Sequence, residues 1–241
     1  MMTGSTFSAH LARAPLYGLG LALALGAAPA WADGQYRVDD AAMIERDQCE
    51  VNIWHSNVRG GGNTSFGELA CRMEWPLEAG VVVGRERDGS HRDTLVELFA
   101  KTAFVDIEQD GYGVALQVAG EYSDDSRRVE LYEVKLPMTA ELADGGLMLH
   151  SNIGLERDRR AEERNAVTWG LGSEMKLARN VWMVAEVSGD DREAGDPFVQ
   201  AGPRLGLWDG RLQLDLSYGR ETSGEKEEIW SVGLTLSTAA F

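Results

Sequence analysis

Alternation of apolar and polar residues, repeated in one segment after another, is the sequence feature that most limits the fold. In residues 211–219, Leu212, Leu214, Leu216 and Tyr218 share one parity, and polar residues or arginine occupy most of the other. Successive side chains of a β-strand point to opposite faces, so this pattern predicts a strand with one apolar and one polar face. The same pattern recurs over most of the chain and predicts an all-β protein.

Twelve such segments can be delimited. They span residues 48–58, 63–75, 79–87, 93–106, 112–123, 129–141, 146–156, 165–177, 181–188, 197–207, 211–219 and 228–237. Most are longer than the strands of soluble proteins, which have about five or six residues on average. They approach the roughly 9–11 residues with which a tilted strand crosses a bilayer. We therefore predict an antiparallel transmembrane β-barrel of about twelve strands; ten is the alternative, because segments 79–87 and 181–188 are short.

The connections between these segments alternate in character. Charged or glycine-rich loops are predicted at residues 59–62, 88–92, 124–128, 157–164, 189–196 and 220–227, and compact turns at 76–78, 106–111, 143–145, 178–180 and 208–210. Polar loops at one end and short turns at the other are typical of outer-membrane barrels. An even number of strands places both ends of the chain on the short-turn, periplasmic side. A soluble β-sandwich is the competing fold, and it would not need to sort its loops in this way.

The first 32 residues are typical of an export signal. A polar start containing Arg13 precedes an apolar stretch over residues 16–26, which is followed by Ala30-Trp31-Ala32. Small residues at the first and third of these positions are those that signal peptidase requires. The apolar stretch is too short for a membrane anchor, which needs about 20 residues. The sequence thus predicts a signal peptide over residues 1–32, a periplasmic N-terminal segment over 33–47 and the barrel over 48–241.

The parity of the strands assigns residues to the two faces of the barrel. The apolar face is expected to contact lipid and the polar face to line the lumen, where charges are tolerated if they are hydrated or paired. The lumen-lining residues are predicted to include Glu50, Glu68, Arg72, Glu74, Glu97, Lys101, Glu121, Glu133, Lys135, His150, Asn152, Glu174, Lys176, Glu186, Arg204, Arg211 and Asp215. Trp54, Trp75, Trp169, Trp182, Trp208 and Trp230 lie mostly near strand ends, as in an aromatic girdle, although about half could be ordinary packing residues.

Cys49 and Cys71 are the only cysteines. A turn centred near Gly60 or Gly61 places position 49 opposite about 71 or 72, on the apolar parity. Directly opposed residues in antiparallel strands are close enough to form a disulfide. We expect the two to pair in an oxidising compartment, and the alternative is two independent small apolar residues.

Composition and motifs favour no enzymatic or nucleic-acid-binding function. The formal net charge of −16 opposes binding to a phosphate backbone. His55-Ser56-Asn57 and His150-Ser151-Asn152 resemble hydrolase residues, but adjacent strand residues point to opposite faces and cannot form a His–Ser hydrogen bond. Acidic pairs such as Asp190-Asp191 lack the spacing of a calcium loop. We therefore predict no catalytic residues, no cofactor and no metal site.

The C-terminal third carries a family resemblance. Residues 184–189 (VAEVSG), 200–205 (QAGPRL), 213–219 (QLDLSYG) and 230–236 (WSVGLTL) occur in this order. Together they resemble the outer-membrane barrels associated with the meta-pathway of phenol degradation. The resemblance covers residues 165–237, and it implies an outer-membrane location and passage of small, in part aromatic, compounds. Barrels of this kind typically end in an aromatic residue on the lipid-facing parity of the last strand, but Phe241 departs from the even parity of Trp230, Val232, Leu234 and Leu236. Either a bulge over residues 237–240 shifts the parity, or the pattern ends at Leu236 and Phe241 is a coincidence.

Two functions follow from these expectations. The first is a passive channel for small solutes, with mild cation preference because acids outnumber bases in the predicted lumen. The second is a structural or surface-interaction barrel whose lumen is closed by its own salt bridges. The expected partners are outer-membrane lipid, the barrel-assembly machinery and a small-molecule solute, and the oligomeric state is not predicted.

Overall fold

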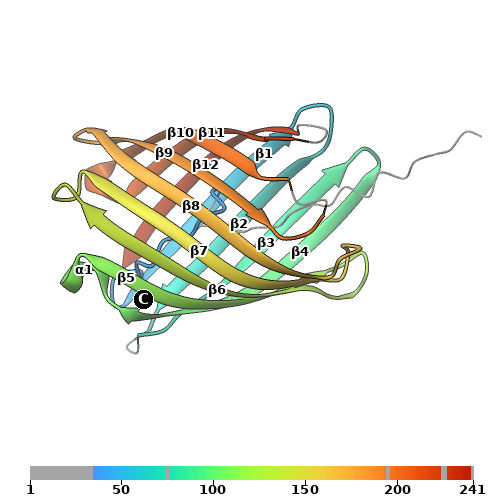
Figure 1. Ribbon diagram of the computed structural model, residues 1–241, viewed down its shortest axis with the longest axis horizontal. Coiled ribbons are helices and arrows are strands. Elements are labelled where there is room, and N and C mark those ends of the chain that lie inside the picture. The colour runs from blue at the N-terminus through green and yellow to red at the C-terminus, as the bar shows by residue number, and fades with distance from the viewer. Residues whose placement is uncertain (1–34, 74–75, 194–195, 224–226, 240–241) are drawn as a thin grey trace, which may run out of the picture.

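The computed structural model describes residues 35–73, 76–193, 196–223 and 227–239, and these form one closed barrel of twelve antiparallel strands (Figure 1). The strands are β1 (Gln48–Val58), β2 (Asn63–Arg72), β3 (Glu78–Asp88), β4 (His91–Val105), β5 (Tyr112–Ser123), β6 (Arg128–Leu142), β7 (Leu147–Asp158), β8 (Asn165–Ala178), β9 (Val181–Asp190), β10 (Phe198–Leu207), β11 (Leu212–Glu221) and β12 (Glu228–Ala239). The predicted fold is confirmed, with twelve strands and not ten.

Each strand pairs with its neighbours in sequence, and β1 closes the barrel by pairing with β12. That closing register runs from Gln48 opposite Ala239 to Val58 opposite Ile229. Closure leaves no sheet edge with unpaired backbone groups, which is what a strand in a hydrocarbon environment requires. No helix in the described part of the chain is long and apolar enough to span a bilayer.

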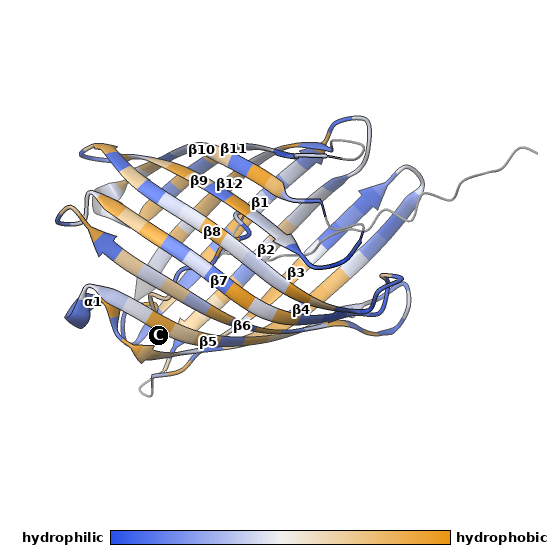
Figure 2. Ribbon diagram, viewed as in Figure 1, coloured by the Kyte–Doolittle hydropathy of each residue, from blue (hydrophilic) through white to orange (hydrophobic). Residues whose placement is uncertain are grey.

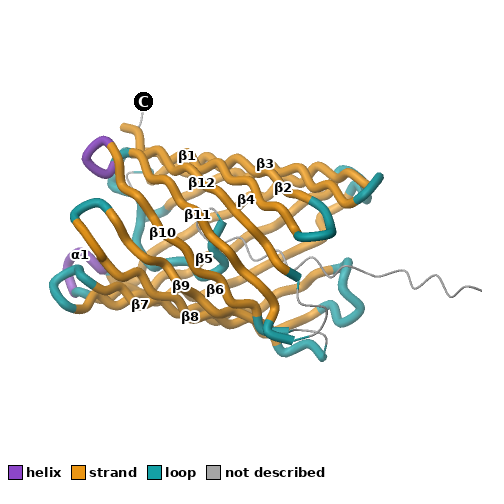
Figure 3. The backbone as a smooth tube through the Cα atoms, turned by 90° about the horizontal axis from the view of Figure 1, so that it is seen from above, coloured by secondary structure: helices purple, strands orange, loops and turns teal. Residues whose placement is uncertain are grey.

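The turns gather at one end of the barrel and the loops at the other (Figure 3). The turn end carries two short helices, α1 (Ile107–Asp110) and the 3-10 helix η1 (Trp208–Gly210). The Asp106 side chain caps α1 by accepting a hydrogen bond from the backbone N–H of Glu108, and Gly111 ends it in the left-handed conformation. One predicted loop differs: residues 88–92 reduce to a tight turn at Gly89-Ser90, because β3 and β4 pair up to Asp88 and His91.

Hydrophilic and hydrophobic residues alternate along the strands (Figure 2), and their burial alternates with them, as the sequence pattern predicts. Exposed outer positions are largely apolar, and Leu98, Leu155 and Leu171 are each more than half exposed. Most buried side chains of the strands are polar or charged and lie in the interior. An outward apolar surface around a polar interior is suited to lipid outside and polar groups inside.

The tryptophans follow the girdle prediction only in part. Trp169, Trp208 and Trp230 are exposed near strand ends, whereas Trp182 is half-buried and Trp75 lies outside the described residues. The prediction is wrong for Trp54, which has the inward parity of Asn52. It is buried and stacks on Phe66, with ring centroids 5.2 Å apart.

Trp54 belongs to an apolar cluster in the interior of β1–β4. The cluster contains Trp54, Phe66, Val82 and Leu95, with Phe99 packed against it. Gly84 makes room for it, because a Cβ there would lie 1.7 Å from Cε1 of the Phe66 ring. One side of the barrel is therefore filled like an ordinary protein core.

Cys49 and Cys71 form the predicted disulfide. They are directly opposed in the register of β1 and β2, and their sulfur atoms are 2.04 Å apart. The bond lies near the turn end of the barrel, where β1 begins and β2 ends. It links the first hairpin covalently.

We expect the folded protein to resist SDS at room temperature, because every strand is paired on both sides. Unboiled and boiled samples should therefore migrate at different apparent masses in SDS gels. A Cys49→Ser/Cys71→Ser variant should keep this behaviour but convert to the boiled form at a lower temperature, since a disulfide contributes on the order of 2–4 kcal/mol. Identical mobility of the wild type before and after boiling would contradict the transmembrane barrel.

Candidate functional site

The interior of the barrel is occupied by the chain itself. Residues 33–47 were expected to be periplasmic, but residues 35–44, here called the inner segment, run inside the barrel. Five of its backbone N–H groups donate hydrogen bonds to side chains of the barrel wall, namely those of Arg37, Val38, Asp39, Ala41 and Ile44. The physical reason is that the wall carries buried acceptors, and a segment of extended chain supplies the donors they need.

Glu186 on β9 holds the middle of the inner segment. Its carboxylate accepts from the backbone N–H of Arg37 at 2.9 Å and from that of Val38 at 3.0 Å. Asn152 on β7 makes a two-way contact with Asp39: its Oδ1 accepts from the Asp39 N–H at 2.7 Å, and its Nδ2 donates to the Asp39 carbonyl at 2.9 Å. These contacts fix the backbone and do not depend on apolar packing.

Ion pairs hold the acidic side chains of the inner segment. Asp39 lies 2.8 Å from the Lys135 ammonium, which also contacts Glu133 at 3.1 Å. Asp40 lies 3.3 Å from the ammonium of Lys101 on β4. Both lysines are buried, and burial of an ammonium group without a partner lowers the stability of the folded protein by several kcal/mol. The inner segment therefore supplies a carboxylate to each of two buried lysines of the wall.

Nearer the start of the inner segment, aromatic and arginine side chains meet. Arg204 on β10 contacts Glu174 and forms a 2.8 Å ion pair with Asp215, and its guanidinium lies 5.5 Å from the centre of the Tyr36 ring. Arg37 lies over the Phe198 ring at 3.8 Å. Both contacts have cation–π geometry.

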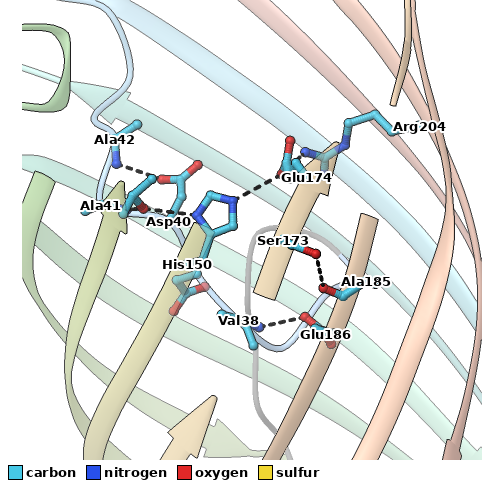
Figure 4. Close-up of polar contacts among 12 residues, drawn as sticks. Val38, Asp40, Ala41, Ala42, His150, Ser173, Glu174, Ala185, Glu186 and Arg204 are labelled. Carbon is cyan, nitrogen blue, oxygen red and sulfur yellow. Dashed lines mark hydrogen bonds and ion pairs between the residues drawn. The ribbon is translucent and has the colours of Figure 1, made fainter. Parts of the chain in front are cut away.

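A small cavity remains between the inner segment and the wall (Figure 4). It encloses about 20 Å³, close to the space of one water molecule, and its lining includes Tyr36, Asp40, His150 and Glu174. His150 contacts the Thr139 hydroxyl through Nδ1 at 3.0 Å, while its buried Nε2 has no hydrogen-bond partner among the described residues. The nearest carboxylate oxygen, on Glu174, is 3.9 Å from that nitrogen.

Loop arginines cover the opposite, loop end of the interior. Arg160 contacts Glu121 at 2.9 Å and Asp158 at 3.1 Å. Arg192 contacts Glu156, and it pairs with Asp190 at 2.9 Å. Buried carboxylates of the wall are thus paired by loop residues at this end and by the inner segment further in.

The predicted lumen residues occupy three kinds of position. Buried or half-buried on the interior face are Glu50, Glu68, Arg72, Glu97, Lys101, Glu121, Glu133, Lys135, His150, Asn152, Glu174, Glu186, Arg204 and Asp215. Lys176 and Arg211 are exposed at the turn end, and Lys176 lies over the Trp182 ring. Glu74 lies outside the described residues.

Several interior residues were not predicted. Glu78, Thr139 and Glu156 have the inward parity of their strands, so a stricter reading of the alternation could have found them. Asp39, Asp40 and Tyr36 precede the first strand, where no alternation marks an inward position. Arg160 and Arg192 reach the interior from loops, which no sequence pattern indicates.

The described residues show no arrangement for hydrolysis or metal binding. His55 Nδ1 lies 2.8 Å from the Ser65 hydroxyl on the neighbouring strand, a pair that the sequence motif did not reveal. Both side chains are exposed, and no carboxylate is hydrogen-bonded to His55 in the described part of the chain. No cluster of three or more potential metal ligands occurs among these residues either. What the interior can do is hold, release or exclude a polar occupant.

We expect a Glu186→Gln variant to loosen the inner segment, because one amide oxygen replaces two charged acceptors and the amide N–H groups would face backbone donors. Hydrogen bonds to charged groups contribute roughly 1.5–3 kcal/mol, so exchange of the Arg37 and Val38 amides should accelerate by about tenfold or more. Hydrogen–deuterium exchange followed by mass spectrometry measures this. A Glu108→Gln variant, altered at an exposed position of α1, should match the wild type; equal protection in all three proteins would contradict the role of Glu186.

Solved structures share this fold at low sequence identity. The KdgM porin aligns with a TM-score of 0.63 and 12% identity, over 78% of this chain and 99% of that chain. The COG4313 outer membrane channel from Pseudomonas putida F1 aligns with a TM-score of 0.64 and 9% identity, over 83% of this chain and 98% of that chain. The NanC porin aligns with a TM-score of 0.60 and 8% identity, over 77% of this chain and 98% of that chain. At such identities the likeness supports the fold.

The comparison with curated proteins finds no match. A family model described as "Uncharacterised conserved protein UCP029691" matches residues 20–238. Because that match includes every strand from β1 to β11 and nearly all of β12, the chain belongs to the family of the uncharacterised conserved protein UCP029691.

Proposed function

We propose that this protein is an outer-membrane channel for small solutes whose lumen is closed by the inner segment in the conformation described here. Residues 1–32 serve as the export signal, the barrel-assembly machinery inserts the strands, and lipid contacts the apolar outer surface. The porins and the channel that share the fold support this function.

One observation carries the proposal: the wall holds the backbone and the aspartates of the inner segment through hydrogen bonds and ion pairs, beside the buried apolar side chains of Tyr36, Val38 and Ala41. Glu186, Asn152 and Thr139 bind its backbone, and Lys135 and Lys101 bind its aspartates. Water can replace such contacts, since a hydrogen bond contributes about 0.5–1.5 kcal/mol between neutral groups and roughly 1.5–3 kcal/mol where one group is charged. The apolar contacts of the segment are fewer: Tyr36 packs against Val184, and Val38 fills the space beside Gly170. The inner segment is therefore suited to leave a lumen that solvent then fills.

The charge of the interior favours neutral or cationic solutes. Glu50, Glu68, Glu97 and Glu133 lie in the interior with Asp215, and bases are fewer there. One KdgM structure is described as a complex with disordered oligogalacturonate, which is a polyanion. A carboxylate-rich interior repels polyanions, so this chain is proposed to differ in solute from that porin. Small aromatic compounds remain among the proposed solutes because of the C-terminal resemblance.

A structural barrel with a permanently closed lumen is the second candidate. The observation that favours it is the cavity of only about 20 Å³ beside the inner segment, together with Arg160 and Arg192 paired over the loop end. In that case the polar contacts would serve the stability of the barrel alone. Conductance separates the two candidates.

We expect removal of residues 35–44 to raise single-channel conductance in planar bilayers severalfold over the wild type, because water replaces the segment in the lumen. A reversible lock provides a test that does not shorten the chain. A Cβ at Gly170 would lie 3.7 Å from the Val38 Cβ, close to the roughly 3.8 Å of a disulfide. The oxidised Val38→Cys/Gly170→Cys variant should therefore be silent and should conduct after reduction.

The control for the lock is the wild type treated with the same oxidant and reductant, which also acts on Cys49–Cys71. Silence of the deletion variant and of the reduced lock, in samples that remain heat-modifiable, would overturn the channel and leave the structural barrel.

We also expect the open channel to prefer cations, most strongly in dilute salt, because screening weakens the field of the carboxylates as ionic strength rises. The reversal potential of the deletion variant in a salt gradient measures this preference. Adding Glu186→Gln and Asp215→Asn should shift the potential toward zero, whereas Glu108→Gln with Glu141→Gln, both at exposed positions of the turn end, should leave it nearly unchanged. Anion preference of the deletion variant would contradict the assignment.

A further inference from the structure

Charge is sorted by sign at the loop ends of β3 and β4. On β3, Val82 and Gly84 face the interior, so the alternation places Glu86 inside and Arg85 and Arg87 on the outer, lipid-facing surface. Both arginines are exposed. On β4, Arg92 has the outward parity and Asp93 the inward one, where Asp93 accepts a hydrogen bond from Ser123 at 2.6 Å. In this strongly acidic protein, the charged side chains that the alternation places on the outer surface of β3 and β4 here are all positive.

The outward arginines lie close together without acidic partners. Arg87 is directly opposite Arg92 in the register of β3 and β4, and Arg85 is opposite Thr94 one outward row further along. Like charges at directly opposed positions are destabilising unless something neutralises them. Among the described residues no carboxylate forms an ion pair with any of the three arginines, whereas Arg160, Arg192 and Arg204 each contact two. The arrangement is suited to an anion from outside the protein.

An apolar surface begins directly below the arginines. Val83 is 50% exposed, and it lies two positions from Arg85 toward the middle of the barrel, opposite Val96. Leu98 and Leu69, at 65% and 47% exposure, continue this surface on the two strands that flank β3. A ligand that fits both parts therefore has an anionic head and long apolar chains. The arginines mark the end of the barrel that carries the charged loops, which is the outer-leaflet end of an outer-membrane barrel.

We propose that the outward face of β3 and β4 binds lipopolysaccharide, with its lipid A phosphates on Arg85, Arg87 and Arg92 and its acyl chains on Val83, Val96 and Leu98. Lipid A phosphates carry no compensating cation in the same molecule, unlike the head group of phosphatidylethanolamine, so they suit an unpaired arginine cluster. Guanidinium groups bind phosphate oxygens through paired, charge-assisted hydrogen bonds. The proposal rests on the outer-membrane location proposed above and not on conductance, so a silent barrel would leave it standing.

The same sorting recurs elsewhere on the rim. On β7, Arg157 is exposed on the outer face between Glu156 and Asp158, which are buried inside. On β11, Arg220 is exposed, and its neighbour Gly219 is buried on the interior face. The β3–β4 face differs from these positions because it brings three arginines together in adjacent rows.

Binding of purified hexa-acylated lipid A to the delipidated, refolded protein tests the proposal, with native mass spectrometry and titrated thermal stability as the two readouts. We expect the Arg87→Gln/Arg92→Gln variant to bind bisphosphorylated lipid A at least about tenfold more weakly than the wild type, since each lost contact is charge-assisted. Lipid A with both phosphates removed should bind the wild type as weakly as the variant binds the intact lipid. The matched control is Arg46→Gln/Arg179→Gln, which removes two exposed arginines at the turn end and should behave as the wild type.

Heat-modifiable mobility of each variant establishes that it is folded. Equal affinity of wild type and Arg87→Gln/Arg92→Gln for lipid A would overturn the proposal, as would an equal loss in the control. Inorganic phosphate and phosphatidylethanolamine serve as the remaining probes. If millimolar phosphate fails to displace lipid A, the site binds the lipid as a whole. If phosphate displaces lipid A and binds as tightly as lipid A does, the site recognises phosphate alone, and docking of the acyl chains is refuted.

Discussion

The pairing of every strand on both sides is the constraint on which the rest of this structure depends. A backbone N–H or C=O group that faces hydrocarbon without a hydrogen-bond partner raises the free energy of the folded state by several kcal/mol. A membrane-spanning sheet must therefore close on itself. Here β1 and β12 provide the closure. Once the sheet is closed, successive side chains of a strand face two fixed environments in turn, lipid outside and a confined interior. The apolar outer surface and the charged inner wall are consequences of that closure.

Confinement explains why the interior is so fully paired. Carboxylates such as Glu121 and Glu186 are almost completely buried, and water has little room beside them. Backbone amides of the inner segment, buried lysines and loop arginines therefore supply their partners. The β1–β4 side solves the same packing problem differently, with aromatic and aliphatic side chains around Phe66. The interior thus combines an extensive polar network with a smaller apolar cluster.

Much of this fold could be predicted from the sequence, because alternation and turn chemistry are local properties. The bounds of β1 and β5 agree with the prediction, and the opposition of Cys49 and Cys71 followed from the position of the first turn. The inner segment could not be predicted, because its partners Asn152 and Glu186 lie more than a hundred residues away and its chain has no cross-strand neighbour. Trp54 does not fit the girdle, because it lies in the middle of β1 on the inward parity of Asn52. Arg160 and Arg192 reach inward from loops, where no periodicity applies.

The disulfide also bears on the order in which the barrel is assembled. Cys71 follows Cys49 by a single hairpin, so the two can join before any of the other ten strands has been added. A slip of one residue between β1 and β2 would turn every side chain of one strand to the wrong face. Oxidation at this point excludes such a slip in the strand that must later receive β12. The disulfide thereby fixes the register of the strand that closes the barrel with β12.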